Sequence, residues 1–370
     1  MPSLFMLFEL KTTEGLREKW GKMPDPESSL LLLQPSLEAK QLPSSLIVKQ
    51  SNPIKLSVVI VNYRQWKYTE QLVRKLGQCE LVRNGHAEII VIDNNSSYHP
   101  AIRRLRSKPY VSLRRWTKNR GFSCAVNEGC KLSSGDWVLI LNPDITPENN
   151  FLDNIDSYLN ANNLHQSKVG VIGFGLRNPD GSVQGSTGPF PTFMGTLARK
   201  FLPRAWRKYN LNNNNEAQKV DWITGCCMLA QRSCLEKLKK FDTDYFLYYE
   251  DVDLCKRIAK AGYDVCYEPS LAVVHHAPIH VRRVPPRLRV ITRQALMTYA
   301  RKHWSKSESK WMCRVIRCEA FVMGIWARFL GDSRAVKWYD RLARYSKLMS
   351  SGSLNKARVE FLAALAEPSA

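Results

Sequence analysis

The chain has 370 residues, of which 44% are hydrophobic and 24% are charged. This composition excludes a largely disordered chain, because frequent apolar runs and 10% aromatic residues can build a core. The formal net charge of +22 favours a polyanionic partner such as nucleic acid, a phosphate-bearing ligand or an anionic membrane surface. The excess is uneven, since residues 281–350 hold 17 Lys and Arg against 4 Asp and Glu, a local charge of +13.

Cysteine spacing and the N-terminus bear on the compartment. The ten cysteines form neither a CxxC pair nor a zinc-ligand pattern, so we expect buried free thiols in a reducing compartment. The first apolar run is too short for a signal peptide. No stretch reaches the roughly 18 apolar residues of a transmembrane helix. These features predict a cytoplasmic protein.

Three regions follow from the pattern of elements. Residues 1–53 are expected to be a poorly ordered extension, with one short helix near 12–22. Residues 54–280 alternate strands with helices, which predicts an α/β domain with a mostly parallel sheet. Residues 281–370 read as a basic helical region. The expected strands are 56–61, 88–93, 110–115, 137–141, 169–174, 220–230, 263–267 and 272–276. The expected helices of the α/β domain are 66–79, 99–107, 122–132, 233–238 and 252–261.

Polar residues follow three of the predicted strands. They are Asn62 with Tyr63, Asp93, and the turn from Asn142 to Asp144. Ligands of parallel sheets bind beyond the carboxyl ends of the strands, where these side chains are expected to meet. The coincidence of three such signals indicates a binding site more strongly than any one of them.

Each signal has a structural alternative. Asp144 could bind a divalent cation, or Asn142–Asp144 could be a simple turn. Asp93 could bind a nucleobase or ribose, or belong to a helix cap. Arg120, in the loop 118–123, could bind an anion at a helix N-terminus, or the loop could only connect two elements.

Two later segments carry further acids and histidines. Aromatic residues lead into Glu250, Asp251 and Asp253, and either of the first two could take a proton from a hydroxyl. The alternative, helix capping by Asp251 with Asp253 in the first turn, leaves the aromatic residues unexplained. His275 and His276 end a predicted strand and could bind a metal or phosphate, or be satisfied by the backbone.

Seven segments in this order resemble the glycosyltransferases of family 2, in particular a rhamnosyltransferase-like branch. The resemblance covers about residues 55–280, and so many ordered motifs do not arise by chance. The segments are VVIVNY at 58–63, IVIDNNS at 90–96, NRGF at 119–122, GDWVLILNPD at 135–144, WITGCCML at 222–229, FLYYEDVDLC at 246–255 and VVHH at 273–276.

The resemblance implies a GT-A fold, Rossmann-like with a C-terminal helical extension, and inversion at the anomeric carbon. It implies that Asp93 binds the nucleobase and that Asp144 is the metal-binding acid of the DxD motif. Asp251 then resembles the general base, with Glu250 beside it, and His275 a late ligand of the metal or diphosphate. The other implied contacts with the nucleotide-sugar are Asn62, Tyr63, Asn119, Arg120 and Asn142.

The chain departs from the family pattern at two places. Asn142 stands where DxD has its first acid, so affinity for the implied Mg2+ or Mn2+ rests mainly on Asp144. After His276 the chain has Ala277-Pro-Ile-His instead of a Gly-Gly-Ser-like loop. Which of His275 and His276 is the ligand therefore stays open.

The expected protein is an inverting hexosyltransferase of polysaccharide biosynthesis in the cell envelope. It would pass a sugar, with rhamnose as one choice, from a nucleotide-diphosphate donor to a hydroxyl of a glycan or lipid-linked acceptor. Two alternatives are an inactive glycosyltransferase-like protein and a nucleic-acid-binding protein, although no specific nucleic acid is expected. A nucleotidyltransferase is disfavoured, because no Gly-rich, Lys- or Arg-bearing loop follows Val61.

The basic region has two interpretations. Residues 281–350 mix Lys and Arg with tryptophans, and 320–330 is apolar on a helical period. Basic helices with tryptophans suit peripheral contact at the inner face of the cytoplasmic membrane. The alternative is ordinary helices that pack on the catalytic domain and expose their basic faces to solvent.

Overall fold

The computed structural model describes residues 54–199, 216–276 and 285–366. Residues Ser51–Ala370 form one compact unit. The extension expected at 1–53, with its helix near 12–22, lies outside the described residues, as does the boundary expected at 280.

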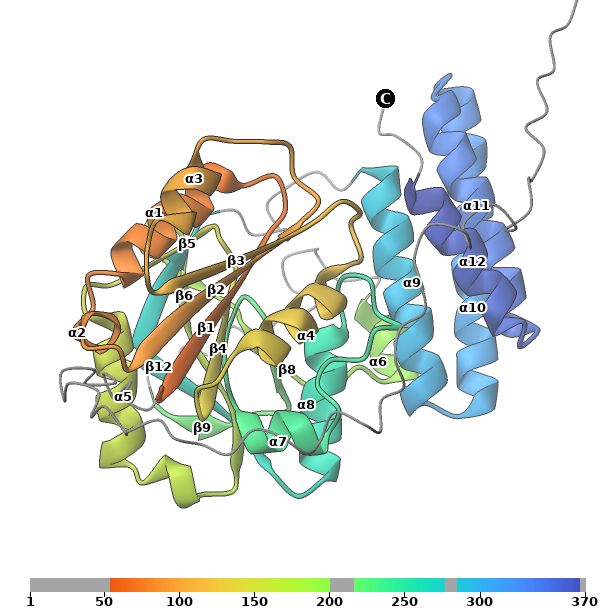
Figure 1. The fold of residues 1–370 in the computed structure, drawn as a ribbon. Coiled ribbons are helices and arrows are strands. Elements are labelled where there is room, and N and C mark those ends of the chain that lie inside the picture. Colours follow the sequence, from red (N-terminus) through yellow and green to blue (C-terminus); the bar gives the residue numbers. More distant parts are fainter. Residues whose placement is uncertain (1–53, 200–215, 277–284, 367–370) are drawn as a thin grey trace, which may run out of the picture. The chain divides into compact units, whose positions relative to one another are not determined.

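A mixed sheet forms the centre of the fold, and Figure 1 shows helices on both of its faces. Its main strands follow the order β3-β2-β1-β4-β11-β6-β12-β5, with β7 added beside β6 and β9 beside β12. Most of these run in one direction, since β3, β2, β1 and β4 pair in parallel, as do β6 and β12. The strands are β1 Leu56–Asn62, β2 Ala87–Asn94, β3 Val111–Trp116, β4 Trp137–Leu141, β5 Ile145–Pro147, β6 Val169–Arg177, β7 Val183–Gln184, β9 Gln218–Lys219, β11 Cys227–Gln231 and β12 Asp264–His275, while β8 Thr187–Gly188 pairs with β10 Trp222–Ile223.

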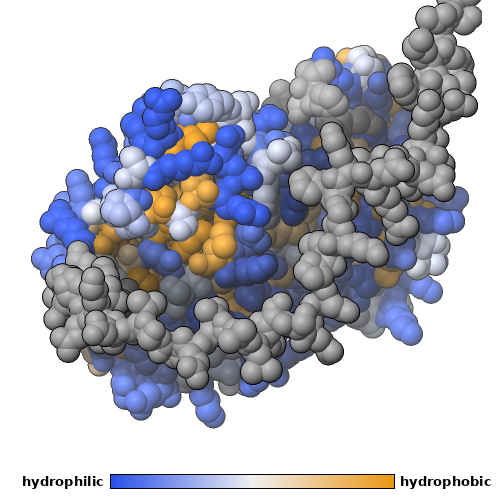
Figure 2. All heavy atoms as spheres, in the orientation of Figure 1, coloured by the Kyte–Doolittle hydropathy of each residue, from blue (hydrophilic) through white to orange (hydrophobic). Residues whose placement is uncertain are grey.

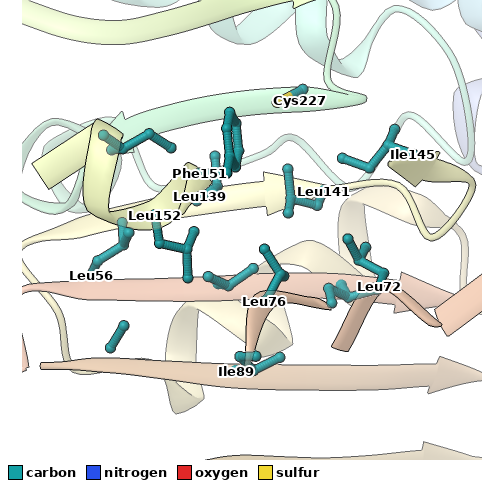
Figure 3. Close-up of a cluster of buried hydrophobic side chains, with 14 of the residues drawn as sticks. Leu56, Leu72, Leu76, Ile89, Leu139, Leu141, Ile145, Phe151, Leu152 and Cys227 are labelled. Atoms are coloured by element: carbon teal, nitrogen blue, oxygen red, sulfur yellow. The ribbon is translucent and has the colours of Figure 1, made fainter. Parts of the chain in front are cut away.

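Helices cover the sheet according to the alternation of side chains along its strands. In β1, Val58 and Ile60 pack with α1, α2, α3 and α5, whereas Val59 and Val61 pack with α4, α7 and α8. Figure 3 shows part of the first cluster. The helices are α1 Trp66–Leu76, α2 Glu80–Arg83, α3 Ala101–Arg106, α4 Phe122–Leu132, α5 Phe151–Ala161, the 3-10 turn Leu164–Gln166, α6 Phe193–Ala198, α7 Arg232–Lys237, α8 Glu250–Lys260, α9 Pro286–His303, α10 Lys306–Phe329, α11 Ser333–Ser350 and α12 Leu354–Ala366. Burial on both faces explains why the strands read as continuous apolar runs.

The C-terminal helices form a core of their own, which includes Met312, Ile316 and Leu342. Helix α9 also reaches the core of the α/β part, where Ala295 and Tyr299 are fully buried. The predicted architecture is therefore confirmed: a mostly parallel α/β sheet flanked by helices, with a C-terminal helical extension. Across the described residues, every helix is too short or too polar to cross a membrane.

Several expected elements differ in detail from those observed. The strand expected at 220–230 is two short strands, because β10 pairs with β8 in a separate two-stranded sheet and the chain enters the main sheet only at β11, after residues 224–226. The strands expected at 263–267 and 272–276 are the single strand β12, with a register shift between Glu268 and Ala272. Helix α5 and strand β5 were not expected from the sequence. All ten cysteines are free, and seven of them are buried, as predicted.

The surface is hydrophilic over most of the face that Figure 2 shows, with an apolar area over the part of the sheet near β2 and β3. Strand β3 is the edge of the sheet on this side, and all six of its residues are at least partly exposed. The last residues of β3 therefore remain reachable from solvent, while those of β1 and β2 are mostly buried.

A Gly to Ala substitution tests how closely α4 lies on β1. A Cβ at Gly129 would lie 2.3 Å from Cγ1 of Val59, a stiff side chain in a buried strand. We expect Gly129→Ala to lower the free energy of unfolding by about 1–3 kcal/mol, because the contact is overpacked. Urea denaturation measures this change.

The matched control is Gly324→Ala in the interior of α10. The nearest atom to its added Cβ is the end of the flexible Arg328 side chain, at 3.3 Å. This variant should gain up to about 1 kcal/mol from helix propensity. Equal shifts in the two variants would contradict the packing described for α4.

Candidate functional site

Asn62 and Asp93 lie side by side at the carboxyl ends of β1 and β2, where the sequence predicted them to meet. Asn62 Nδ2 donates to Asp93 Oδ1 at 3.0 Å and to Ser96 Oγ at 3.1 Å. Asn62 Oδ1 accepts from Thr69 Oγ1 at 2.9 Å. Asn62 and Asp93 are fully buried, so this pair holds the β1 and β2 loops together.

Arg115 is a candidate functional residue at this edge that sequence reasoning missed. It stands opposite Asp93 in the β2–β3 register, and its Nε donates to Asp93 Oδ2 at 2.9 Å. Its Nη2 donates to the carbonyl of Ser96 at 3.0 Å. The Arg115 side chain is 30% exposed and that of Asp93 is 0% exposed, so a ligand at this edge reaches the arginine first. Its position at the end of the strand expected at 110–115 was the available signal.

Asn94 organises the loop that carries Asn119 and Arg120. Its Oδ1 accepts from the Arg120 backbone N–H at 2.8 Å, and its Nδ2 donates to the Gly121 carbonyl at 3.1 Å. Asn119 Oδ1 accepts from the Gly121 N–H at 2.9 Å. The Arg120 guanidinium lies 4.7 Å from the centre of the Trp116 ring and is exposed. The loop thus presents a positive group beside the β3 end.

The same loop contacts the aromatic segment before α8. The Phe122 N–H donates to the Phe246 carbonyl at 2.7 Å. Gly121 has φ +89°, and a Cβ there would lie 2.6 Å from that carbonyl oxygen. Glycine is required at this position both by the backbone conformation and by the close approach. Tyr63 directly follows β1, and the Arg64 guanidinium lies 5.1 Å from the centre of its ring.

Asp144 and His275 are neighbours, as both metal assignments require. His275 pairs with Ile145 across β12 and β5, and its Nε2 lies 3.6 Å from Asp144 Oδ1. The His275 Nδ1 faces Gln184 Oε1 at 3.0 Å. His276 turns elsewhere, with its Nε2 2.8 Å from Thr146 Oγ1. Of the two histidines, the structure places His275 beside the acid.

Asp144 and His275 are two candidate metal ligands. Within 54–199, 216–276 and 285–366, no group of three or more His, Cys, Asp and Glu side chains is placed to hold a metal ion. Asp144 is 6% exposed, and Asn142 next to it is half-buried. One carboxylate and one imidazole suit a divalent cation whose remaining ligands are phosphate oxygens and water.

A two-residue bridge joins the Asp144 loop to Asp251. The Gly225 N–H donates to Asp251 Oδ2 at 3.1 Å, and the Asn142 N–H donates to the Cys226 carbonyl at 2.9 Å. Residues 224–226 belong to neither β10 nor β11, because the backbone groups of Gly225 and Cys226 bond to Asp251 and to the Asp144 loop. Three motifs distant in sequence therefore converge on one place.

The three acids near the start of α8 have different surroundings. Asp251 faces Gly225 and is 5% exposed, and its Oδ1 also accepts from the Val252 N–H at 2.8 Å. Glu250 is equally buried. Tyr249, and not Asp251, occupies the N-cap position of α8, and no side chain caps the helix. The capping alternative for Asp251 is therefore wrong.

Asp253 is a buried structural acid. Its Oδ2 accepts from Arg257 Nε at 2.7 Å, and its Oδ1 lies 2.7 Å from His303 Nε2 and accepts from Tyr245 Oη at 3.2 Å. Burial opposes ionisation of Asp253, but the hydrogen bonds from His303 and Arg257 outweigh it, so its pKa lies below the ordinary value. Burial raises the pKa of Tyr245 far above its ordinary value, which keeps this phenol a donor.

Helix α9 fixes the segment that leads into α8. His303 bonds Asp253, and Gln294 Nε2 donates to the Asp244 carbonyl at 3.1 Å. Tyr248 and Tyr249 have φ of +73° and +66°, and such left-handed conformations cost of order 1–3 kcal/mol each outside glycine. The Tyr249 ring lies 5.5 Å from that of Tyr299 on α9. Packing against α9 therefore helps to hold an unfavourable backbone next to Asp251.

The sequence matches one family model and several named glycosyltransferases. Residues 57–239 match the family model of glycosyl transferase family 2. An N-acetylglucosaminyl-diphospho-decaprenol L-rhamnosyltransferase of Mycobacterium tuberculosis is 29% identical over 284 residues, covering 70% of this chain and 89% of that protein. A rhamnosyltransferase of Escherichia coli is 26% identical over 226 residues, covering 60% and 83%. Among solved structures, a mannosyltransferase from Pyrobaculum calidifontis in complex with GDP-Man and Mn2+ has a TM-score of 0.47 at 18% identity, covering 85% and 90%.

Asp253→Asn tests the buried contacts of this carboxylate with Arg257 on α8 and His303 on α9. At pH 7 we expect the free energy of unfolding to fall by about 3 kcal/mol, because Arg257 loses its buried counter-charge and His303 loses a carboxylate partner. A depressed folded pKa stabilises the protein above the ordinary pKa of Asp, about 3.9, and this contribution disappears as the pH falls through the lower folded value. The difference between wild type and variant should therefore shrink below about pH 4.

The control is Asp180→Asn, which alters an exposed carboxylate whose partner is Ser182. This variant should unfold like the wild type at pH 7. A constant difference between wild type and Asp253→Asn from pH 7 to pH 3 would contradict an ionised Asp253.

Proposed function

Because the chain belongs to glycosyl transferase family 2 and is a hexosyltransferase-type enzyme, we propose that it passes a sugar from a nucleotide-diphosphate donor to an acceptor hydroxyl with inversion. The observation that carries the proposal is the bridge at 225–226. It brings Asp251, the proposed base, to the loop that holds Asp144, the proposed metal-binding acid.

We assign the nucleotide to the ends of β1, β2 and β3. The cations there, the partly exposed Arg115 and the exposed Arg120, suit a donor that carries two phosphates. Asn62 and Asp93 are buried beneath them, and Asp93 holds Arg115 through a 2.9 Å hydrogen bond. In this assignment Asp93 contributes to nucleotide binding chiefly by orienting Arg115. The remaining proposed donor contacts are Tyr63, Asn119 and Asn142.

We assign the divalent cation, Mg2+ or Mn2+, to Asp144 with His275. When bound there, such an ion neutralises negative charge on the departing diphosphate. The carboxylate and the imidazole face each other at 3.6 Å, which supports the pair as ligands. His276 is engaged with Thr146, so the structure favours His275 in this role.

The proposed reaction is a single displacement. Asp251 accepts the proton of the acceptor hydroxyl, and the oxygen attacks the anomeric carbon from the face opposite the leaving group. The bond between that carbon and the diphosphate oxygen breaks, and the nucleoside diphosphate leaves with the electron pair. Gly225 N–H, donating to Asp251 Oδ2, fixes the direction of the carboxylate. Glu250 lies next to the base and is the alternative proton acceptor.

The names of the relatives support a narrower proposal for the sugar and the acceptor. Two of them are rhamnosyltransferases, and the name of one includes an N-acetylglucosaminyl-diphospho-decaprenol acceptor. We propose rhamnose, from dTDP-rhamnose, as the sugar and a lipid-linked or free glycan hydroxyl as the acceptor, in the biosynthesis of a cell-envelope polysaccharide. A screen of nucleotide-sugars for donor hydrolysis tests the choice, and faster hydrolysis of another donor would contradict it.

Asp251→Asn tests the base assignment. The amide keeps an oxygen for the Gly225 N–H but cannot take up a proton at neutral pH, so kcat should fall by roughly 10²–10⁴-fold. The dissociation constant of the nucleotide-sugar, measured by calorimetry, should stay unchanged. Steady-state transfer assays with the donor found in the screen measure kcat.

Glu250→Gln is the matched control for the neighbouring acid. It should retain most of the transfer activity and show an unchanged melting temperature. Near wild-type transfer by Asp251→Asn, together with loss of transfer in Asp144→Ala, would show that Asp251 is not the base.

Mn2+ binding tests the metal assignment independently of transfer. With two protein ligands the ion should bind weakly alone and clearly more tightly in the presence of dTDP, because phosphate oxygens complete its shell. Calorimetry with dTDP should show this gain in the wild type and its loss in Asp144→Ala. His275→Ala should weaken binding, whereas the control His276→Ala should leave it unchanged. Loss in His276→Ala alone would move the ligand to His276.

A further inference from the structure

Helix α10 carries an apolar face that none of the described parts of the chain covers. The structure exposes fourteen large hydrophobic side chains, and seven of them lie between residues 311 and 330. Their exposed fractions run from 51% to 79%. They are Trp311, Phe321, Val322, Ile325, Trp326, Phe329 and Leu330. This concentration on one helix distinguishes the face from the scattered exposed apolar residues of any soluble surface.

Four of these residues, Trp311, Val322, Ile325 and Phe329, lie on one stripe along the helix axis. With the exposed Arg314 and Cys318 between them, the positions 311, 314, 318, 322, 325 and 329 follow a period of three or four residues. Phe321, Trp326 and Leu330 adjoin this stripe. From 311 to 330 the stripe extends about 28 Å, at 1.5 Å per residue. The opposite side, with Met312, Ile316 and Ala320, is buried against the neighbouring helices. Helix α10 therefore has two apolar faces, one buried against the neighbouring helices and one exposed to solvent.

Aromatic rings dominate its C-terminal half. Trp326 and Phe329 stack with ring centres 5.6 Å apart. Towards the N-terminal half, Arg314 lies over Trp311, with its guanidinium 4.9 Å from the ring centre. A long cationic side chain over an exposed tryptophan is the pairing that suits the boundary between lipid head groups and acyl chains.

The charges around the stripe select one occupant. Lys310, Arg314 and Arg334 are exposed at or near it, in a region of net charge +13. Of the four acids between 281 and 350, Glu319 bonds Arg293 and Asp340 bonds Arg328. The other two, Glu308 and Asp332, cap the starts of α10 and α11. A second copy of this face would meet it with like charge, whereas an anionic lipid surface would complement it.

We propose that the outer face of α10, defined by Trp311, Arg314, Cys318, Val322, Ile325 and Phe329 with the adjoining Phe321, Trp326 and Leu330, is a docking surface for an anionic lipid bilayer. The helix lies in the plane of the surface, with its apolar stripe below the head groups and its basic flanks among them. This proposal goes beyond the assignment of the reaction, because it uses no residue placed in the sugar-transfer site. It decides between the two interpretations of the basic region by giving each a separate surface: α9 packs on the α/β core, and the outer face of α10 meets lipid.

Cys318 gives a direct probe of this face. All ten cysteines lie within the described residues, and Cys318 is the only one that is exposed. The full chain is labelled at Cys318 with an environment-sensitive fluorophore and mixed with vesicles of phosphatidylcholine, with or without phosphatidylglycerol. We expect a blue-shifted, brighter emission with the anionic vesicles at low salt, and little change with the neutral ones. The Cys318→Ser variant, treated in the same way, corrects for labelling elsewhere.

Vesicle sedimentation of the unlabelled full chain then separates the two contributions. The triple variant Phe321→Ser, Ile325→Ser and Phe329→Ser should lower partitioning to anionic vesicles by at least about tenfold, because it removes three apolar side chains that would enter the bilayer. Lys310→Glu with Arg314→Glu should weaken it by a similar factor and reduce its salt dependence. The control Leu132→Ser with Met194→Ser removes exposed apolar side chains on other helices and should bind as wild type.

All the changed side chains are exposed, so each variant is expected to fold. Circular dichroism and donor hydrolysis verify this. Equal binding of the wild type and the triple variant would overturn the proposal. A wild type that does not bind anionic vesicles at low salt would also overturn it, and a dimer in ultracentrifugation that the triple variant abolishes would then identify a second copy as the occupant. Loss of vesicle binding with retained hydrolysis leaves the proposed reaction intact, so the two proposals fail separately.

Discussion

The buried carboxylate of Asp253 is the interaction on which the rest of the site depends. It accepts hydrogen bonds from Arg257 on its own helix and Tyr245 before it, and it lies 2.7 Å from His303 on α9. A charge this deeply buried is tolerated only when it is paired, so α8, the segment before it and α9 must keep the arrangement that pairs it. The contacts of Asp253 also fix the start of α8, and with it the position of Asp251 two residues earlier. The C-terminal helices are therefore part of the construction of the site.

A second buried network lies at the carboxyl ends of β1 and β2. Asn62, Asp93 and Ser96 bond one another below the surface, and Asp93 directs Arg115 toward it. Both networks follow the same physical rule: polar groups at the ends of buried strands lose water and must find partners inside the protein. The partners then fix which charged side chain remains accessible. At the ends of β2 and β3 the accessible group is the Arg115 guanidinium, a cation that suits a diphosphate.

Sequence patterns predicted the regular part of the fold well. The run Trp137–Leu141 and the helix Phe122–Leu132 have the predicted bounds, because continuous burial and helical spacing are local properties. The 220–230 segment was misread as one strand, since nothing local shows that Gly225 and Cys226 bond to distant loops. Helix α5 was missed although its buried residues Phe151, Leu152, Ile155 and Leu159 are helically spaced.

The sequence by itself determined the family, the order of the motifs and the fact that acids follow buried strands. It could not assign Asp253, because three acids within four residues look alike until their neighbours are known. It could not choose between His275 and His276, which only the β12–β5 register separates. Only the tertiary structure revealed Arg115 beside Asp93 and the exposed stripe on α10. Side-chain pairing and burial depend on contacts between elements far apart in the chain, whereas periodicity depends only on neighbours.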